Sequence, residues 1–154
     1  MTAVLPEGLL AAGAVCGELL RARGETVATG EGSCGGLIST ALLAVPGASA
    51  YFLGGSVIYT KHALDGLLTG QVERPPKLRG ASEPWVMHLA EAARKHIGAT
   101  WGIGEGGATG PSGNPYGDPA GHAWVGVSGP VDASRHVLTG DDDRAANMVA
   151  FAIA

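Results

Sequence analysis

The chain is poor in the residues that would place it in several large classes of protein. It has two cysteines in 154 residues, and the spacing of Cys16 and Cys34 matches neither a metal site nor a disulfide framework. Its ten lysines and arginines are scattered and the formal net charge is −4. Phosphate neutralisation needs clustered cations, so we expect no nucleic-acid partner. We also expect the thiols to be reduced.

Long apolar runs are also missing. The most apolar stretch near the beginning, Gly8–Gly17, is flanked by Glu7 and Glu18. It is too short to cross a bilayer, and it lacks the basic start of a signal peptide. The sequence therefore predicts a cytoplasmic protein without a membrane partner.

What the chain does have is aliphatic mass: 45% of its residues are hydrophobic but only 5% are aromatic. Such a composition is typical of helices packed on a sheet, and the length suits a single domain covering residues 1–154. Apolar spacing and turn residues predict alternating elements. Helices are expected at Glu7–Ala22, Leu37–Ala44, Thr60–Leu68, Ser82–Gly98 and Asp143–Ala154, and strands at Thr26–Thr29, Ser56–Tyr59, Thr100–Ile103, Ala123–Val127 and His136–Leu138. The order predicts an α/β fold, a mixed sheet with helices on both faces.

Two of these helices carry explicit packing predictions. In the first helix, Leu9, Leu10, Leu19 and Leu20 are expected to contact the core. The helix Ser82–Gly98 should begin with Ser82 as its N-cap. Its spacing predicts one buried face and one exposed face. The buried face comprises Val86, Leu89, Ala90, Ala93 and Ile97, and the exposed face carries Glu91 and Lys95.

A glycine-rich turn, Gly30–Gly36, lies between a predicted strand and a predicted helix. Such a turn leaves backbone N–H groups unpaired at the helix N-terminus, where they can bind a phosphate or a developing oxyanion. Ser33 and Cys34 are possible nucleophiles at this position. A helix N-terminus lowers a thiol pKa, so Cys34 is expected to be more reactive than Cys16. The alternative is a turn that only packs the helix on the strand, with Ser33 as its N-cap.

Two further segments have the composition of a site. Tyr59-Thr60-Lys61-His62 places a tyrosine and a lysine at a strand-to-helix junction, where a partly desolvated lysine can activate a hydroxyl; the alternative is a solvated lysine. Gly104–Gly121 is dense in glycine and proline and is expected to be an irregular functional loop, or else a flexible surface loop. The remaining histidines show no ligand spacing, so no metal and no cofactor are expected.

Several of these blocks resemble, in order and spacing, the C-terminal domain of the competence/damage-inducible CinA proteins. The matching blocks are Gly30-Glu31-Gly32-Ser33-Cys34-Gly35-Gly36, Pro46-Gly47-Ala48-Ser49, Gly54-Gly55-Ser56-Val57-Ile58-Tyr59-Thr60-Lys61-His62-Ala63-Leu64, Ala81-Ser82-Glu83, Gly107-Ala108-Thr109-Gly110-Pro111-Ser112-Gly113 and Pro119-Ala120-Gly121-His122-Ala123-Trp124. The resemblance covers nearly the whole chain and implies a three-layer α/β/α sandwich that forms homo-oligomers. Stand-alone members of the family are nicotinamide mononucleotide (NMN) amidohydrolases with a serine nucleophile and a lysine base.

The departures from the family pattern fall on those catalytic positions. Gly32 stands where the family has its serine, Cys34 where it has a threonine, and Leu64 where it has its lysine. We therefore expect Ser33 as nucleophile, Lys61 as base and Tyr59 as a hydrogen-bonding partner of either Lys61 or the substrate. The residues expected to bind the substrate are Glu31, Cys34, Gly35, Gly36, Gly107, Thr109, Gly110, Ser112 and Arg144.

Two functions follow from this comparison. The first is hydrolysis of the carboxamide of a pyridine mononucleotide, or of a similar small amide, with the N–H groups of Cys34–Gly36 holding the oxyanion or the phosphate. The second is a catalytically inactive member that kept the pocket for ligand binding or for a structural role.

Overall fold

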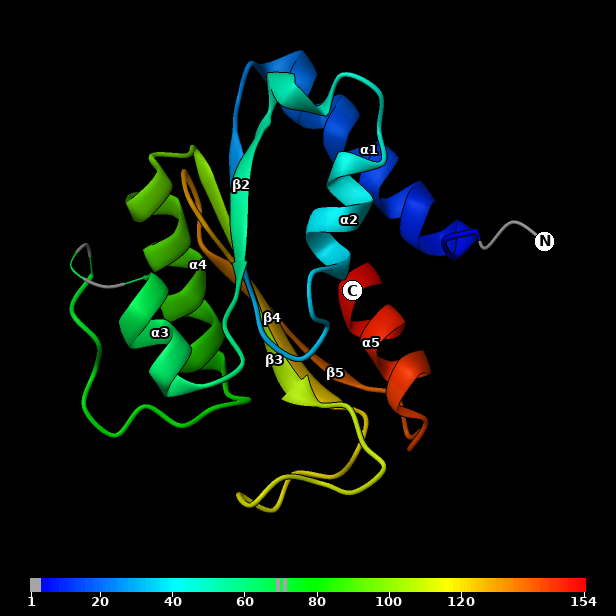
Figure 1. Ribbon diagram of the computed structural model, residues 1–154, viewed down its shortest axis with the longest axis vertical. Coiled ribbons are helices and arrows are strands. Elements are labelled where there is room, and N and C mark those ends of the chain that lie inside the picture. Colours follow the sequence, from blue (N-terminus) through cyan, green and yellow to red (C-terminus); the bar gives the residue numbers. More distant parts are fainter. Residues whose placement is uncertain (1–3, 69, 71) are drawn as a thin grey trace.

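The computed structural model describes residues 4–68, 70 and 72–154, and within them helices cover both faces of one five-stranded sheet (Figure 1). Helices α3 and α4 lie on one face, and α1, α2 and α5 lie on the other. The elements, in chain order, are α1 (Glu7–Arg23), β1 (Val27–Glu31), α2 (Leu37–Leu43), a 3-10 turn (Ala48–Ala50), β2 (Phe52–Val57), α3 (Lys61–Leu67), α4 (Glu83–Ile97), β3 (Trp101–Ala108), β4 (His122–Ser128), β5 (Ala133–Leu138) and α5 (Arg144–Ile153). The predicted fold class is confirmed.

The sheet is mixed, with the strand order β2-β1-β3-β4-β5. Strand β1 pairs in parallel with both β2 and β3, whereas β3–β4 and β4–β5 are antiparallel. Because parallel strands share a direction, their carboxyl ends meet at one edge of the sheet. At that edge Glu31 is in register with Val57 on one side and with Glu105 on the other.

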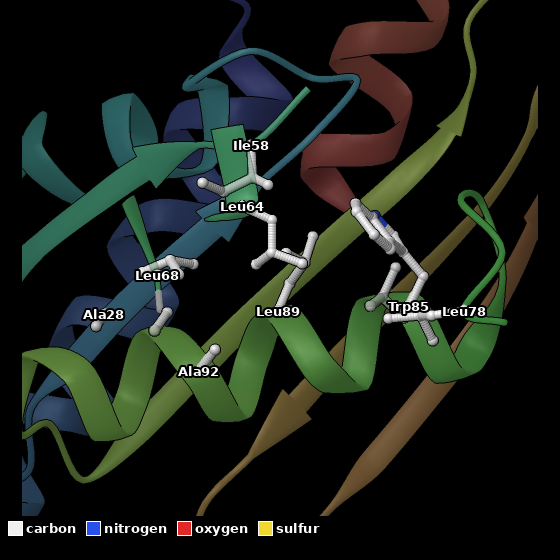
Figure 2. Packing of buried hydrophobic residues seen from close by; sticks show 10 residues of the cluster. Ala28, Ile58, Leu64, Leu68, Leu78, Trp85, Leu89 and Ala92 are labelled. Atoms are coloured by element: carbon white, nitrogen blue, oxygen red, sulfur yellow. The ribbon is translucent and has the colours of Figure 1, made fainter. Parts of the chain in front are cut away.

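Helix α4 packs closely on the middle of the sheet because the strands under it carry glycine. A Cβ at Gly102 would lie 1.8 Å from the Ala90 carbonyl oxygen, and one at Gly104 would lie 1.9 Å from that of Val86. No side chain fits in that space, so these glycines set the distance between helix and sheet. Figure 2 shows the core on this face, where Leu64 and Leu89 pack together.

The packing prediction for α4 is confirmed. Its N-cap is Ser82, whose hydroxyl accepts a hydrogen bond of 3.4 Å from the Trp85 N–H. The predicted inward residues are fully buried, except for the half-buried Ile97 at the end of the helix. On the outer face Lys95 pairs with Glu91 at 2.6 Å.

Two expectations about the elements are wrong. Leu19 of α1 is 59% exposed, because α1 buries mainly Leu9, Gly13 and Gly17. The two glycines face Ala41 and Tyr51 of the same chain. The segment Gly104–Gly121 is not irregular throughout, because β3 continues to Ala108. Its glycines are compatible with a strand because they admit α4 on one face and because the backbone is paired with β1 and β4 on both sides.

Candidate functional site

The glycine-rich turn connects the carboxyl end of β1 to α2 and is largely buried. Gly35 and Gly36 have φ values of 64° and 99°, which side chains rarely adopt, so the turn depends on glycine there. The Gly35 N–H donates to the Gly32 carbonyl at 3.2 Å. This tight turn places Gly32 and Ser33 beside β3.

A first buried carboxylate, Glu31, holds the start of α2. One of its oxygens accepts hydrogen bonds from the Ile38 N–H at 2.8 Å and from the Cys34 thiol at 3.2 Å. The other accepts from the N–H of Ser39, also at 2.8 Å, and from its hydroxyl. Both oxygens of this predicted binding residue are therefore used inside the protein to cap a helix.

A second buried carboxylate, Glu105 of β3, lies against the other side of the turn. Its Oε2 accepts hydrogen bonds from the Gly32 N–H at 3.0 Å and from the Cys34 N–H at 2.9 Å. Its Oε1 accepts from the Ser33 hydroxyl. Complete burial raises the pKa of Glu105, and the hydrogen bonds from Cys34, Ser33 and Gly32 offset part of that effect.

Sequence reasoning missed Glu105 because the strand was expected to end at Ile103. A signal was present: a strand buried on both faces is apolar, and a carboxylate inside one is costly unless hydrogen bonds satisfy it. Extending the strand by two residues would have singled out Glu105 as a residue with a special role.

The expectation of a reactive Cys34 thiol is wrong. Burial strongly raises the pKa of Cys34, and the negative charges of Glu105 and Glu31 raise it further. The helix N-terminus does not ionise the thiol, since two carboxylates face it and α2 is short. The expected anion-binding donors are also largely used, because the N–H groups of Cys34 and Gly35 bond within the loop region.

A pocket of about 280 Å³ opens beside the turn, at the carboxyl edge of the parallel strands. Among the residues proposed from sequence, Ser33, Tyr59 and Gly107 line it. Ser33 is 7% exposed, so its hydroxyl lies in the wall rather than in open solvent. The remaining lining residues are Gly32, Ile58, Gly80, Ala81, Trp85, Gly106, Asn114 and Tyr116.

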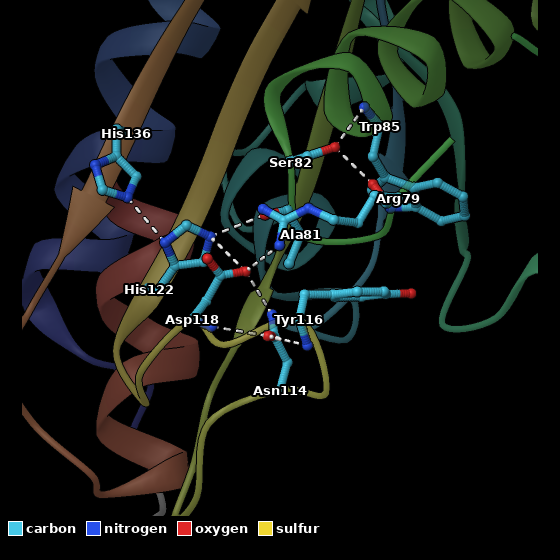
Figure 3. A network of polar contacts seen from close by, with 9 residues as sticks. All are labelled: Arg79, Ala81, Ser82, Trp85, Asn114, Tyr116, Asp118, His122 and His136. Atoms are coloured by element: carbon cyan, nitrogen blue, oxygen red, sulfur yellow. Dashed lines mark hydrogen bonds and ion pairs between the residues drawn. The ribbon is translucent and has the colours of Figure 1, made fainter. Parts of the chain in front are cut away.

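One wall of the pocket is held by a polar network that comes from two distant loops (Figure 3). Asp118 pairs with Arg79 at 2.9 Å and accepts a hydrogen bond from the Asn114 side chain at 2.8 Å. His122 bonds to the Ala81 carbonyl at 2.8 Å. Burial by itself raises the pKa of Asp118, but hydrogen bonds from Asn114 and Arg79 and the charge of His122 lower it below its ordinary value. The network fixes the loop that carries Asn114 and Tyr116.

Arg144 does not line the pocket, but it contacts Tyr59, which does. The Arg144 guanidinium donates to the Gly110 carbonyl at 2.8 Å and to the Tyr59 hydroxyl at 3.3 Å. Thr109 is buried, with its carbonyl bonded to the Asn147 side chain at 2.9 Å, while Ser112 is exposed. Of the four residues proposed from the second glycine-rich segment, Gly107 lines the pocket, whereas Thr109, Gly110 and Ser112 do not.

Lys61 is the first residue of α3, is exposed and does not line the pocket. Thr60 caps that helix by accepting a hydrogen bond of 3.1 Å from the Ala63 N–H. Leu64, at the family lysine position, is 2% exposed and belongs to the core. Across the described part of the chain, the side-chain partner of the Ser33 hydroxyl is Glu105. A base role for Lys61 therefore stays a prediction.

Neither a metal centre nor a membrane span is seen in residues 4–68, 70 and 72–154. No group of three or more His, Cys, Asp or Glu side chains is arranged there to hold a metal ion. No helix there is both long and apolar enough to cross a membrane.

The fold and the pocket define an α/β/α protein with a built polar site at the carboxyl ends of its parallel strands. Comparison with known families then places it: a family model described as the CinA C-terminal domain matches residues 11–154. The chain therefore belongs to the CinA C-terminal domain family.

Curated relatives agree with this assignment. The chain is 40% identical over 134 residues to a CinA-like protein of Anaeromyxobacter sp. (strain K), covering 86% of this chain and 33% of that protein. It is 43% identical over 123 residues to a CinA-like protein of Prochlorococcus marinus (strain MIT 9313), covering 76% of this chain and 28% of that protein. The chain spans about a third of the length of these relatives.

Solved structures share the fold. The competence/damage-inducible protein CihA from Agrobacterium tumefaciens aligns over 99% of this chain and 93% of its own, with a TM-score of 0.87 and 23% identity. The competence damage-inducible protein A (ComA) from Klebsiella pneumoniae aligns over 94% of this chain and 89% of its own, with a TM-score of 0.83 and 25% identity.

Proposed function

We propose that this chain hydrolyses the carboxamide of a pyridine mononucleotide such as NMN, or of a similar small amide, with the Ser33 hydroxyl as nucleophile. The observation that carries the proposal is the position of that hydroxyl. It lies in the wall of a pocket and is hydrogen-bonded to a buried carboxylate. A hydroxyl held by a neighbouring group that accepts its proton is the usual arrangement of a serine nucleophile.

The other walls of the pocket fit a pyridine mononucleotide. Aromatic rings from Tyr59, Trp85 and Tyr116 line it. The pyridinium ring of NMN is flat and positively charged, and aromatic faces attract such rings. Arg144 is exposed and lies beside the lining residue Tyr59, and a guanidinium is suited to bind a phosphate.

The test is ammonia release from purified protein incubated with NMN. Ser33→Ala should abolish release, because no other hydroxyl then occupies that place in the pocket wall. Ser49→Ala is the matched control, since Ser49 is exposed on the 3-10 turn and should leave the rate unchanged. Full activity of Ser33→Ala would remove Ser33 from the mechanism.

A second function, binding without hydrolysis, is favoured by one observation. The family serine and lysine positions are here Gly32 and the buried Leu64, and Lys61 does not line the pocket. Calorimetry together with the ammonia assay separates the two functions. Saturable binding of NMN with no ammonia release over long incubation would favour binding without hydrolysis.

We also propose, on the family resemblance, that the protein forms a homo-oligomer in the cytoplasm. Sedimentation at micromolar concentration should give a mass that is at least twice the 15.4 kDa of one chain. A single species of monomer mass across the concentration range would contradict this.

A further inference from the structure

The Ser33–Glu105 pair joins two segments that the fold brings together from 72 residues apart. Ser33 lies in the glycine-rich turn after β1, and Glu105 lies on β3 next to that turn. The hydroxyl donates to Oε1, whereas the two backbone N–H groups donate to Oε2. The two carboxylate oxygens thus have separate roles: one holds the turn and the other faces the nucleophile.

In the part of the chain that the structure describes, Glu105 has no cationic partner. Within the described ranges no lysine, arginine or histidine forms an ion pair with it, and its partners are N–H and O–H donors. A carboxylate buried in this way favours taking up a proton, because the protonated form needs less solvation. The Ser33 hydroxyl is the group placed to supply that proton.

We propose that Glu105 is the general base of this enzyme, accepting the Ser33 proton at Oε1; this rests on the proposed function of Ser33 as nucleophile. Burial raises the pKa of Glu105 above that of an exposed glutamate, which makes its carboxylate a stronger base towards the Ser33 proton. Glu105 then takes the role of base that was expected of Lys61 from the sequence.

The proton balance closes with Glu105 alone. Ser33 Oγ bonds to the carboxamide carbon, its proton passes to Glu105, and the carbonyl electron pair moves to oxygen. The C–N bond then breaks as Glu105 returns the proton to nitrogen, releasing ammonia and leaving an ester on Ser33. Water attacks the ester and gives a proton to Glu105, and Ser33 leaves with that proton, releasing the acid. The sum is an amide plus water giving a carboxylic acid and ammonia.

Glu105→Gln is a sharp test because glutamine can keep the turn in place. Its amide oxygen can occupy the Oε2 position and accept from the Gly32 and Cys34 N–H groups. Its NH₂ group then faces Ser33, which it can hydrogen-bond but whose proton it cannot accept. The matched control is Glu91→Gln, a carboxylate on the outer face of α4.

The experiment measures labelling of Ser33 by a small fluorophosphonate, with the site and rate read by mass spectrometry, so that it does not depend on the amide substrate. We expect labelling of the parent at Ser33 and a rate that increases with pH as Glu105 loses its proton. In Glu105→Gln the rate should decrease by about 100-fold or more and lose that pH dependence. Glu91→Gln should label like the parent.

Several outcomes would overturn the proposal. They are equal labelling of Glu105→Gln and parent, loss of labelling in Lys61→Met with Glu105→Gln unaffected, and no labelling of the parent. The pH dependence of the parent provides a check that needs no variant: a rate that falls as pH rises would contradict a carboxylate base. Labelling as expected without ammonia release from any amide tested would overturn the proposed function and leave the Ser33–Glu105 pair standing.

Discussion

The guanidinium of Arg144, at the start of α5, donates a hydrogen bond of 3.3 Å to the hydroxyl of Tyr59, 85 residues earlier in the chain. The same guanidinium donates to the Gly110 carbonyl at 2.8 Å. Arg144 therefore connects the end of the β2 segment, the loop after β3 and the last helix. Of these contacts, Tyr59 lines the pocket that also holds Ser33.

Arg144→Met should increase the KM for NMN by about tenfold, the value expected for loss of one charge-assisted hydrogen bond to the phosphate, with a smaller effect on kcat. The measurement compares NMN with nicotinamide riboside, which has no phosphate. The KM for the riboside should increase much less than the KM for NMN. Arg135→Met, on the exposed strand β5, is the control and should change neither substrate's KM. An equal increase in KM for both substrates would instead mean that Arg144 acts by holding Tyr59.

Glu105 should make stability depend on pH in a defined direction. Its pKa is raised in the folded protein above the value of about 4.3 for an exposed glutamate, so folding favours the protonated form. The contribution of Glu105 to stability is complete below the pKa of the unfolded state and is lost as pH increases through the pKa of the folded state.

Urea unfolding of the parent and of Glu105→Gln at pH 4.5 and pH 8 provides the check. The free energy of unfolding of the parent, minus that of the variant, should be larger at pH 4.5. Other titrating groups cancel in this difference, and Glu91→Gln should show no comparable change. A difference that grows with pH would mean that the hydrogen bonds dominate and that the pKa is lowered.

The two thiols should differ in reactivity, in the order opposite to that expected from the sequence. Cys16 is exposed on α1, whereas Cys34 is fully buried with a strongly raised pKa. With a thiol-reactive disulfide reagent at pH 8, native protein should react at one thiol per chain. The second should react only in denaturant. Cys16→Ala should then show almost no reaction in the native state; fast labelling of Cys34 in that variant would contradict the buried placement.

Two glycine-to-alanine changes should have opposite effects on stability. At Gly104 the new Cβ would lie 1.9 Å from the Val86 carbonyl oxygen, so α4 or β3 must move, at a cost of about 1–3 kcal/mol. At Gly66, inside α3, no atom lies within 4 Å of the new Cβ, and alanine should stabilise the helix by about 0.5–1 kcal/mol. Thermal or urea unfolding measures both, and a stabilised Gly104→Ala would contradict the close packing of α4.

The sequence by itself determined the layers of this protein. Apolar residues at helical spacing in Val86–Ile97 predicted the buried face of α4, because that periodicity is local and survives in any fold that covers the helix on one side. The cap Ser82 follows from equally local chemistry, since its hydroxyl accepts a hydrogen bond from the N–H three residues later. The glycine-rich turn between β1 and α2 was predicted for the same reason, because clustered glycines are a local signal of a turn.

Only the tertiary structure decided which groups act on that turn. The parallel pairing of β1 with β3 places Glu105 beside Ser33, and no local pattern encodes a contact across 72 residues. Burial then reversed the expectation for Cys34, because the pKa of a thiol depends on desolvation and on neighbouring charges as well as on a helix end. The glycines of β3 resembled a loop in sequence. They lie in a strand because α4 approaches it too closely for side chains, and that approach exists only once the sheet has formed.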